Sequence, residues 1–372
     1  MKPVRFALVG GGPGAFIGPV HRLAAELDRE LSLVAGAFSS DASRSREAGE
    51  RFGIASDRAY PTMEAMLKAE AMRPDGIEMV AIATPNHLHF AQARAALEAG
   101  LGVMSDKPAT ATLAEARALA EVIERTGGHY GLTFTYTGYP MIREARARIA
   151  AGEIGRVRKV MVEYLQGWLA QPVEAAGNKQ AAWRVDPAKA GVGGCIGDIG
   201  VHAFNLAEFV VGDTIAAINA DLAAVVADRQ LDDDATVLLR FAGGARGLLA
   251  ASQIATGERN NLRLRVYGEK GSIAWSHEAC DRLVITGADS CDWTIWAGSA
   301  DVGEHCRMAS RLPAGHPEGY FEAFANLYRD FARSLRGETT GLLPGSAEGL
   351  RSMAFVETAV AGNGAGWKEL LS

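Results

Sequence analysis

Residues 5–18 read RFALVGGGPGAFIG, a short apolar run that leads directly into a glycine-rich loop. The run predicts a buried strand, and residues 19–28 beyond the loop predict a helix. Glycines at such a turn let the backbone approach a pyrophosphate, and the helix N-terminus adds N–H donors and a positive dipole end. The spacing departs from GxGxxG, because Gly10 and Gly12 fit but the third glycine, Gly18, comes three residues late. The stretch therefore predicts a dinucleotide-binding loop, with a glycine-rich turn that binds no ligand as the alternative.

Strands and helices alternate after this loop. The pattern predicts strands at 31–38, 78–83, 102–105 and 129–135, and helices at 64–71, 88–99 and 112–126. Strands separated by helices of this length form βαβ units with a mostly parallel sheet. Ligands bind beyond the carboxyl ends of such strands, so polar residues just after those ends are candidate contacts. They are Thr84, Asn86, His87, Asp106, Lys107 and Tyr136.

The end of the second predicted strand bears on the choice of dinucleotide. A site that prefers NAD usually carries Asp or Glu there, to bind the adenosine ribose. This chain has Ser39 and Ser40, followed by Asp41 and Arg44. Hydroxyls and a guanidinium suit the 2′-phosphate of NADP, whereas Asp41 can still reach the ribose of NAD. The sequence therefore predicts NAD(P), with a slight preference for NADP.

The pattern changes after Gly152 and Gly155. Strands are predicted at 158–166, 215–227, 235–242, 246–254, 262–268, 271–276 and 282–286, and helices at 318–336 and 346–361. Strands that follow one another without helices indicate a mainly antiparallel sheet. The acidic run at 232–234 predicts a solvent-exposed turn rather than a metal site. The fold class is thus α/β plus α+β, with a dinucleotide-binding domain at 1–137 and a second domain at 138–372.

A second glycine-led stretch, GCIGDIGVHAFNLAEFVVG at 194–212, places Asp198 and His202 four residues apart. Residues at this spacing share one helix face, so the carboxylate and the imidazole can point into the same space. A carboxylate beside a histidine stabilises the imidazolium and fixes the tautomer, as a general base near neutral pH requires. The alternative is that Asp198 caps the helix N-terminus and that His202 is a half-buried structural residue.

Two further loop sequences are candidates for substrate contacts. Trp183 and Arg184 precede the second glycine-led stretch, and His316 lies in the Pro-flanked sequence GHPEGY at 315–320. A Trp beside an Arg can line a sugar-sized pocket by stacking and hydrogen bonding, although a structural Trp and a surface Arg are the commoner explanations. Functional groups often lie on loops, so His316 is also a candidate.

The composition limits the class of protein. A length of 372 residues exceeds one ordinary core, and 48% hydrophobic with 22% charged residues is typical of a soluble globular protein. The net charge of −6 argues against nucleic-acid binding. No segment reaches the roughly 18 apolar residues that a membrane helix needs. The four cysteines have no metal-ligand spacing, so we expect no metal and reduced thiols in the cytoplasm.

With these pieces in order, nearly the whole chain resembles the Gfo/Idh/MocA oxidoreductases, the family of glucose–fructose oxidoreductase and inositol dehydrogenase. The most specific motifs are ATPNHLH at 83–89, DKP at 106–108 and GDIGVH at 197–202. The resemblance implies an N-terminal Rossmann domain, followed by a larger antiparallel sheet that carries substrate and dimer contacts. Two features depart from the family pattern: Asp106 replaces the usual glutamate of an EKP motif, and the glycine loop is longer.

The resemblance also implies roles for individual residues. Lys107 looks like the active-site lysine, Asp198 like its carboxylate partner and His202 like the proton-transferring residue. The implied contacts to the nicotinamide end are Thr84, Asn86 and His87, and those to the pyrophosphate are Gly10, Gly12 and Gly18. Asp106 keeps a carboxylate, so a ribose contact can persist with altered geometry.

The activity that the resemblance implies is hydride transfer between a nicotinamide and a secondary hydroxyl or ketone of a sugar, glycoside or cyclitol. Two alternatives are a redox-neutral glycoside hydrolase that keeps its NAD bound and a non-catalytic dinucleotide-binding regulator. The expected partners are a small-molecule substrate and a second copy of the chain, in a homodimer or homotetramer through the C-terminal sheet, with no nucleic acid or membrane.

Overall fold

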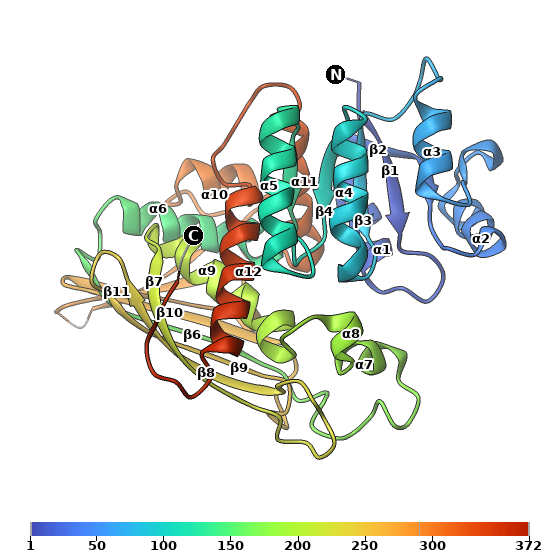
Figure 1. The fold of residues 1–372 in the computed structure, drawn as a ribbon. Coiled ribbons are helices and arrows are strands. Elements are labelled where there is room, and N and C mark those ends of the chain that lie inside the picture. The colour runs from blue at the N-terminus through green and yellow to red at the C-terminus, as the bar shows by residue number, and fades with distance from the viewer. Residues whose placement is uncertain (1, 290, 371–372) are drawn as a thin grey trace. The chain divides into compact units, whose positions relative to one another are not determined.

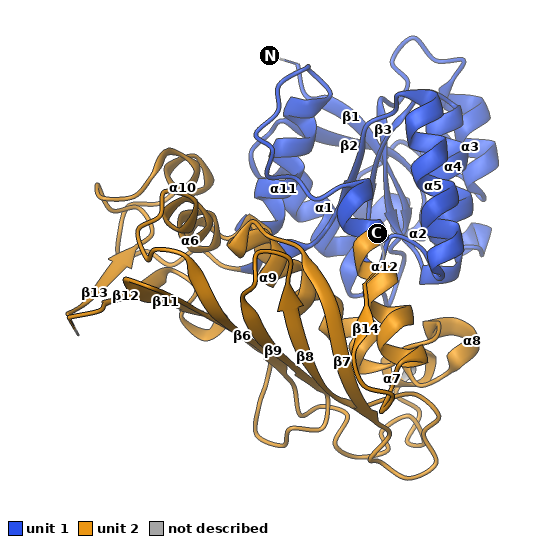
Figure 2. Ribbon diagram, turned by 60° about the vertical axis from the view of Figure 1, so that its left-hand side comes forward, with its two compact units in different colours: residues 1–135, 320–350 blue, residues 136–319, 351–372 orange. Residues whose placement is uncertain are grey.

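The computed structural model describes residues 2–289 and 291–370 (Figure 1). The chain forms two compact units (Figure 2): residues 1–135 with 320–350, and residues 136–319 with 351–372. A division into domains at residue 137 stays a prediction. Residues 320–350 group with the first unit because Phe324 and Phe331 are completely buried in its core.

The first unit is built on a parallel sheet with the strand order β2-β1-β3-β4-β5. Its strands are β1 (Val4–Gly10), β2 (Leu31–Ala37), β3 (Met79–Ala83), β4 (Gly102–Ser105) and β5 (Tyr130–Leu132). Every residue of β3 is buried, as a central parallel strand requires. The prediction of a parallel βαβ sheet is confirmed.

Helices cover both faces of this sheet. They are α1 (Ile17–Leu27), α2 (Ala42–Phe52), α3 (Met63–Glu70), α4 (His89–Glu98), α5 (Leu113–Thr126) and α11 (Tyr320–Ser334). Helix α1 packs against α11 and α4 against α5, and Figure 2 shows the two pairs on opposite faces. The sequence did not predict α2, whose polar composition hides its helical period.

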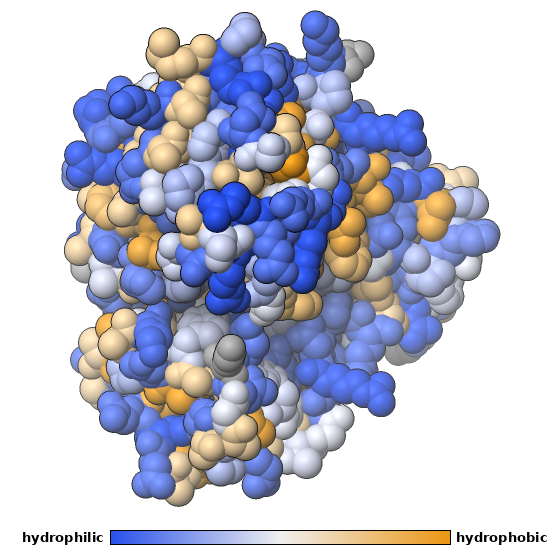
Figure 3. Space-filling model, turned by 90° about the vertical axis from the view of Figure 1, so that its right-hand side faces the viewer, coloured by the Kyte–Doolittle hydropathy of each residue, from blue (hydrophilic) through white to orange (hydrophobic). Residues whose placement is uncertain are grey.

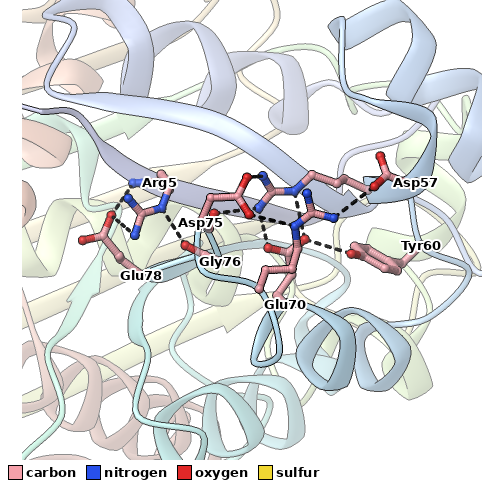
Figure 4. Close-up of polar contacts among 9 residues, drawn as sticks. Arg5, Asp57, Tyr60, Glu70, Asp75, Gly76 and Glu78 are labelled. Carbon is pink, nitrogen blue, oxygen red and sulfur yellow. Dashed lines mark hydrogen bonds and ion pairs between the residues drawn. The ribbon is translucent and has the colours of Figure 1, made fainter.

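An ion network lies beside β1 (Figure 4). Arg58 and Glu70 are both buried and form a salt bridge, and the Tyr60 hydroxyl donates to Glu70 at 2.8 Å. Arg5 pairs with Glu78 at 3.2 Å. A buried charge is tolerated only when it is paired and hydrogen-bonded, so this network fixes the connections around α3.

The second unit contains a nine-stranded sheet with the order β13-β12-β11-β10-β6-β9-β8-β7-β14. Its strands are β6 (Val157–Leu165), β7 (Ile215–Ala223), β8 (Asp234–Phe241), β9 (Arg246–Ser252), β10 (Asn261–Gly268), β11 (Gly271–Ser276), β12 (Arg282–Gly287), β13 (Asp292–Trp296) and β14 (Lys368–Glu369). All neighbours are antiparallel except the parallel pair β6–β9. The prediction of a mainly antiparallel sheet is confirmed.

One face of this sheet is covered by α6 (Pro140–Ala150) and α9 (Val201–Val211). Strand β8 shows the alternation: Val237 and Leu239 are buried, whereas Leu238 is 43% exposed on the opposite face. The remaining helices are α7 (Lys179–Arg184), α8 (Pro187–Ala190), α10 (Glu304–Ala309) and α12 (Ser346–Ala361).

The prediction of a solvent-exposed turn at 232–234 is wrong. Asp233 is only 2% exposed and accepts hydrogen bonds from the N–H groups of Val225 and Val226. The two oxygens of Asp232 accept from the N–H groups of Gly194 (2.6 Å) and Ile196 (2.7 Å). These carboxylates satisfy backbone donors that have no strand or helix partner, so the acidic run anchors the segment that leads to Asp198.

The surface is mixed in character. On the face drawn in Figure 3, hydrophobic side chains form small groups separated by hydrophilic ones. No helix within the described residues is both long and apolar enough to cross a membrane.

Candidate active site

The loop after β1 is packed so tightly that glycine is required at all three predicted positions. A Cβ on Gly10, which has φ of +83°, would lie 2.6 Å from the Ala83 carbonyl oxygen. A Cβ on Gly12 would lie 2.5 Å from the Phe38 carbonyl oxygen. Gly18 lies in the first turn of α1, where a Cβ would approach the Cα of Gly11 to 2.1 Å. The longer loop therefore keeps the close packing of helix on loop that the third glycine of the motif provides.

The position of this loop suits a pyrophosphate. Strand β1 lies between β2 and β3, so the strand order reverses at its carboxyl end, where ligands bind in open α/β sheets. No side chain caps the N-terminus of α1 and no acidic residue lies in its first turn, so nothing there opposes an anion. The residues present fit a dinucleotide.

Beyond β2, the two charged candidates both have protein partners. Asp41 caps α2 and accepts from the N–H groups of Ser43 (2.8 Å) and Arg44 (2.9 Å). The hydrogen bond from the Ser43 hydroxyl is the main reason why the pKa of Asp41 is lowered. Arg44 donates to the Pro13 carbonyl oxygen at 2.9 Å and thereby holds the glycine loop. Ser39 accepts from the Asp41 N–H group, and Ser40 is exposed.

Candidate contacts also follow β3 and β4. The Thr84 hydroxyl donates to Gln92 at 2.7 Å, and Asn86 and His87 lie in a 3₁₀ turn with His87 exposed. Asp106 accepts from the Lys107 N–H group at 2.9 Å and from the Thr133 hydroxyl at 2.7 Å. The carboxylate of the DKP sequence is therefore held in place by the end of the neighbouring strand β5.

Sequence reasoning missed His89, the last residue of the ATPNHLH motif. Its side chain is completely buried, and its two ring nitrogens lie 2.7 Å from the Pro108 carbonyl oxygen and 2.8 Å from that of Thr84. The available signal was the histidine at the start of a predicted helix, but the sequence alone could not show what it touches.

In the second unit, Asp198 lies in a π-helical turn (Ile196–Gly200) that runs directly into α9, which carries His202. The N–H group of Asp198 already donates to the Gly194 carbonyl oxygen at 2.9 Å, so Asp198 lies inside the helix and does not cap it. Short π-helical turns occur frequently at functional sites. The Asp198 Oδ2 atom accepts from Arg184 and from Gln253, each at 2.9 Å.

Aromatic side chains surround His202, which is 9% exposed. The ring of Tyr136 packs edge-on against it with centroids 5.1 Å apart, and Tyr164 follows at 6.1 Å. The hydroxyl groups of these tyrosines lie 2.5 Å apart, and that of Tyr164 donates to Asn260 at 2.7 Å. Burial raises the pKa of Tyr136 to about 12, so this hydroxyl keeps its proton near neutral pH. Sequence reasoning missed Tyr164, Asn260 and Gln253, because they lie in or beside strands that are distant in the sequence.

The structure brings Arg184 to Asp198 and leaves His316 apart. The Arg184 guanidinium lies over the rings of Trp183 (4.2 Å) and Trp168 (5.6 Å). His316 lies in an exposed loop, where its Nδ1 atom is 3.3 Å from the Pro313 carbonyl oxygen. Among the contacts of residues 2–289 and 291–370, none connects His316 with Asp198 or His202. Within the same residues, no group of three or more His, Cys, Asp or Glu side chains is arranged to hold a metal ion.

Comparison with known proteins gives matches along the chain. A model described as the oxidoreductase family with an NAD-binding Rossmann fold matches residues 4–134, and the GFO/IDH/MocA C-terminal domain matches residues 142–274. The chain is 34% identical to the uncharacterized oxidoreductase YfiI of Bacillus subtilis (strain 168), over 99% of this chain and 97% of that protein. It is 29% identical to the levoglucosan dehydrogenase of Pseudarthrobacter phenanthrenivorans, over 86% of each.

A solved structure is similar over almost the full length. The inositol dehydrogenase homologue from Azotobacter vinelandii, complexed with NAD⁺, has a TM-score of 0.94 at 37% identity and covers 99% of this chain and 97% of its own. Its similarity extends over both units, which the two family models also match. The chain belongs to the Gfo/Idh/MocA family of oxidoreductases, with an NAD-binding Rossmann fold in its N-terminal part.

Proposed function

We propose that the protein is an NAD(P)-dependent dehydrogenase that oxidises a secondary hydroxyl of a neutral sugar, glycoside or cyclitol, or reduces the corresponding ketone. The observation that carries the proposal is the placement of Asp198 and His202 on consecutive helical turns, with Arg184 and Gln253 bonded to the carboxylate. The relatives named for levoglucosan and inositol support the substrate class. Nothing in the comparisons favours the hydrolase or the regulator.

Each proposed catalytic residue has a distinct role. NAD, when bound, supplies the hydride acceptor. His202 takes the proton of the substrate hydroxyl, and Asp198 orients the imidazole and stabilises its charged form. Lys107 donates a hydrogen bond to the oxygen whose charge changes. The proposal that Lys107 and His202 act on the same oxygen rests on the sequence motifs DKP and GDIGVH.

The proposed cofactor residues lie in the first unit. Gly10, Gly12 and Gly18 give the pyrophosphate room, and the other contacts follow the strand ends. These others are Ser39, Ser40, Arg44, Thr84, Asn86, His87, Asp106 and Lys107. NAD is the form that the family description names. A preference for NADP remains a proposal that requires Arg44 to exchange the Pro13 carbonyl for a 2′-phosphate.

The proposed substrate wall is polar but nearly neutral. The charge of Arg184 is balanced by Asp198, and Gln166 and Asn260 offer amide groups that are joined by a 2.6 Å hydrogen bond. Amides and tyrosines recognise hydroxyl groups without demanding a charged substrate. We therefore propose that Tyr136, Trp183 and Arg184 line the pocket. His316 is a weaker member of this set, since its loop is exposed.

We also propose a homodimer or homotetramer through the large sheet, in a reducing cytoplasm. The sheet face opposite α6 and α9 exposes Leu238 (43%), Tyr267 (37%) and Trp296 (40%), which a partner would cover. All four cysteines are free thiols. Sedimentation of the wild type and of Leu238→Glu tests the assembly: a monomeric wild type would contradict it.

A dinucleotide-linked absorbance screen tests the activity. The wild type is mixed with NAD or NADP and a panel of inositols, monosaccharides, anhydrosugars and glycosides. We expect reduced dinucleotide with at least one neutral polyol, and its loss in His202→Ala. Release of free sugar from an aryl glycoside without net reduction of the dinucleotide would instead indicate the hydrolase.

A further inference from the structure

We propose that His89 is a positioning residue that ties the segment after β3 to the segment after β4, and so sets the spacing between Thr84 and Lys107. The inference rests on the proposed function only for its kinetic readout.

The tie begins where the sheet ends. The last paired residues of β3 and β4 are Ile82 and Ser105, and one further hydrogen bond of 2.9 Å joins the Asp106 N–H group to the Ile82 carbonyl oxygen. Beyond this point the backbones are no longer paired with each other. The imidazole of His89 takes over the connection, with Nε2 at 2.8 Å from the Thr84 carbonyl oxygen and Nδ1 at 2.7 Å from that of Pro108.

The two bonded residues belong to the motifs that carry the proposed chemistry. Thr84 opens the loop with Asn86 and His87, and Pro108 directly follows Lys107. His89 is the first residue of α4 and is completely buried, so its ring is held by packing as well as by its two polar contacts. Because the ring is rigid and contacts both segments, it fixes the distance between the two motifs.

Both acceptors are backbone carbonyl oxygens, which offer lone pairs and no proton. Whichever ring nitrogen carries a proton, the imidazole therefore donates to the end of one of the two segments.

Two variants separate this tie from general packing. His89→Leu removes both ring nitrogens, whereas His89→Gln carries its N–H groups on one nitrogen and can reach only one of the two carbonyl oxygens. The matched control is His129→Gln, an exposed histidine of the same unit that precedes β5. A misplacement of order 1 Å can cost about 10²-fold in rate. We expect a loss of about this size in kcat for His89→Leu, a smaller loss for His89→Gln and none for the control.

The readouts distinguish positioning from loss of the fold. NAD affinity, measured by fluorescence titration, should fall less than kcat in both His89 variants, because the glycine loop after β1 is untouched whereas the segments with Thr84 and Lys107 shift. Backbone hydrogen exchange in the segments after β3 and β4 should be faster in His89→Leu than in the wild type, and unchanged in His129→Gln.

Each outcome bears on the proposal separately from the proposed function. Wild-type hydrogen exchange in these segments, or an unchanged kcat, in folded His89→Leu would overturn the tie. If the wild type oxidises none of the polyols, the proposed function fails, and the exchange rates still decide whether His89 bridges the two segments. If His89→Leu does not fold, the same two measurements on His89→Gln provide the test.

Discussion

Asp232→Asn tests whether the acidic run holds the helix that carries Asp198 and His202. The two carboxylate oxygens of Asp232 each accept one backbone N–H, from Gly194 at 2.6 Å and from Ile196 at 2.7 Å. Asparagine offers one oxygen and one NH₂ group, so one of the two N–H groups loses its acceptor and faces a donor instead.

The structure sets the expected size of the effect. A hydrogen bond to a charged group contributes about 1.5–3 kcal/mol. Burial raises the pKa of Asp232, so the folded chain already carries part of the cost of holding this carboxylate ionised. We therefore expect Asp232→Asn to lower the free energy of unfolding by about 2 kcal/mol.

Equilibrium unfolding in urea measures this loss. The matched control is Asp234→Asn. Asp234 is half-buried, and no side-chain hydrogen bond is described for it among residues 2–289 and 291–370, so we expect a change within about 0.5 kcal/mol. Asp232→Asn should also lower kcat on an identified substrate, while its NAD affinity stays unchanged. Equal stability of the two variants, with wild-type kcat for Asp232→Asn, would refute the reasoning.

Three further predictions concern the catalytic residues, the dinucleotide and pH. His202→Ala and Lys107→Ala should each lose about 10²–10⁴-fold in turnover, and Asp198→Asn should lose less. The double variant of Lys107 and His202 should be little worse than either single variant. Losses that multiply in the double variant would contradict a shared role. Arg44→Ala should weaken the binding of NADP more than that of NAD in fluorescence titrations. Equal losses of affinity would mean that Arg44 only holds the glycine loop through its hydrogen bond to Pro13. Burial lowers the pKa of His21 from 6.5 to about 4, so below pH 6.5 the unfolded chain binds a proton that the native chain does not. The free energy of unfolding should therefore fall by about 3 kcal/mol between pH 6.5 and 4. Urea unfolding at each pH measures this loss, and His21→Gln should not show it.

Local patterns predicted most of the fold. Helix and strand periods are properties of neighbouring residues, so β11 and α12 were located at their observed bounds and most other elements within a few residues. The packing of α11 on the first unit was not predictable in this way. It depends on Phe331 filling the space left by Gly102, more than 200 positions earlier in the chain.

The residues of the candidate site were predictable where they lie close together in the sequence. The spacing of Asp198 and His202 was visible because both lie within one turn. Their partners were not, because Arg184, Gln253 and Tyr164 come from helix α7, the residue after β9 and strand β6, which only the fold brings together. The same reason hid His89, whose two acceptors belong to different segments.

Deuterium transfer tests the central claim most directly. The polyol selected by the absorbance screen is prepared with deuterium on its ring carbons and incubated with the wild type and the dinucleotide. Mass spectrometry should find one deuterium in the reduced dinucleotide for each ketone formed. Ketone formed with an unlabelled reduced dinucleotide would contradict direct hydride transfer, and so would a protein that binds NAD but reduces it with no neutral polyol of the panel.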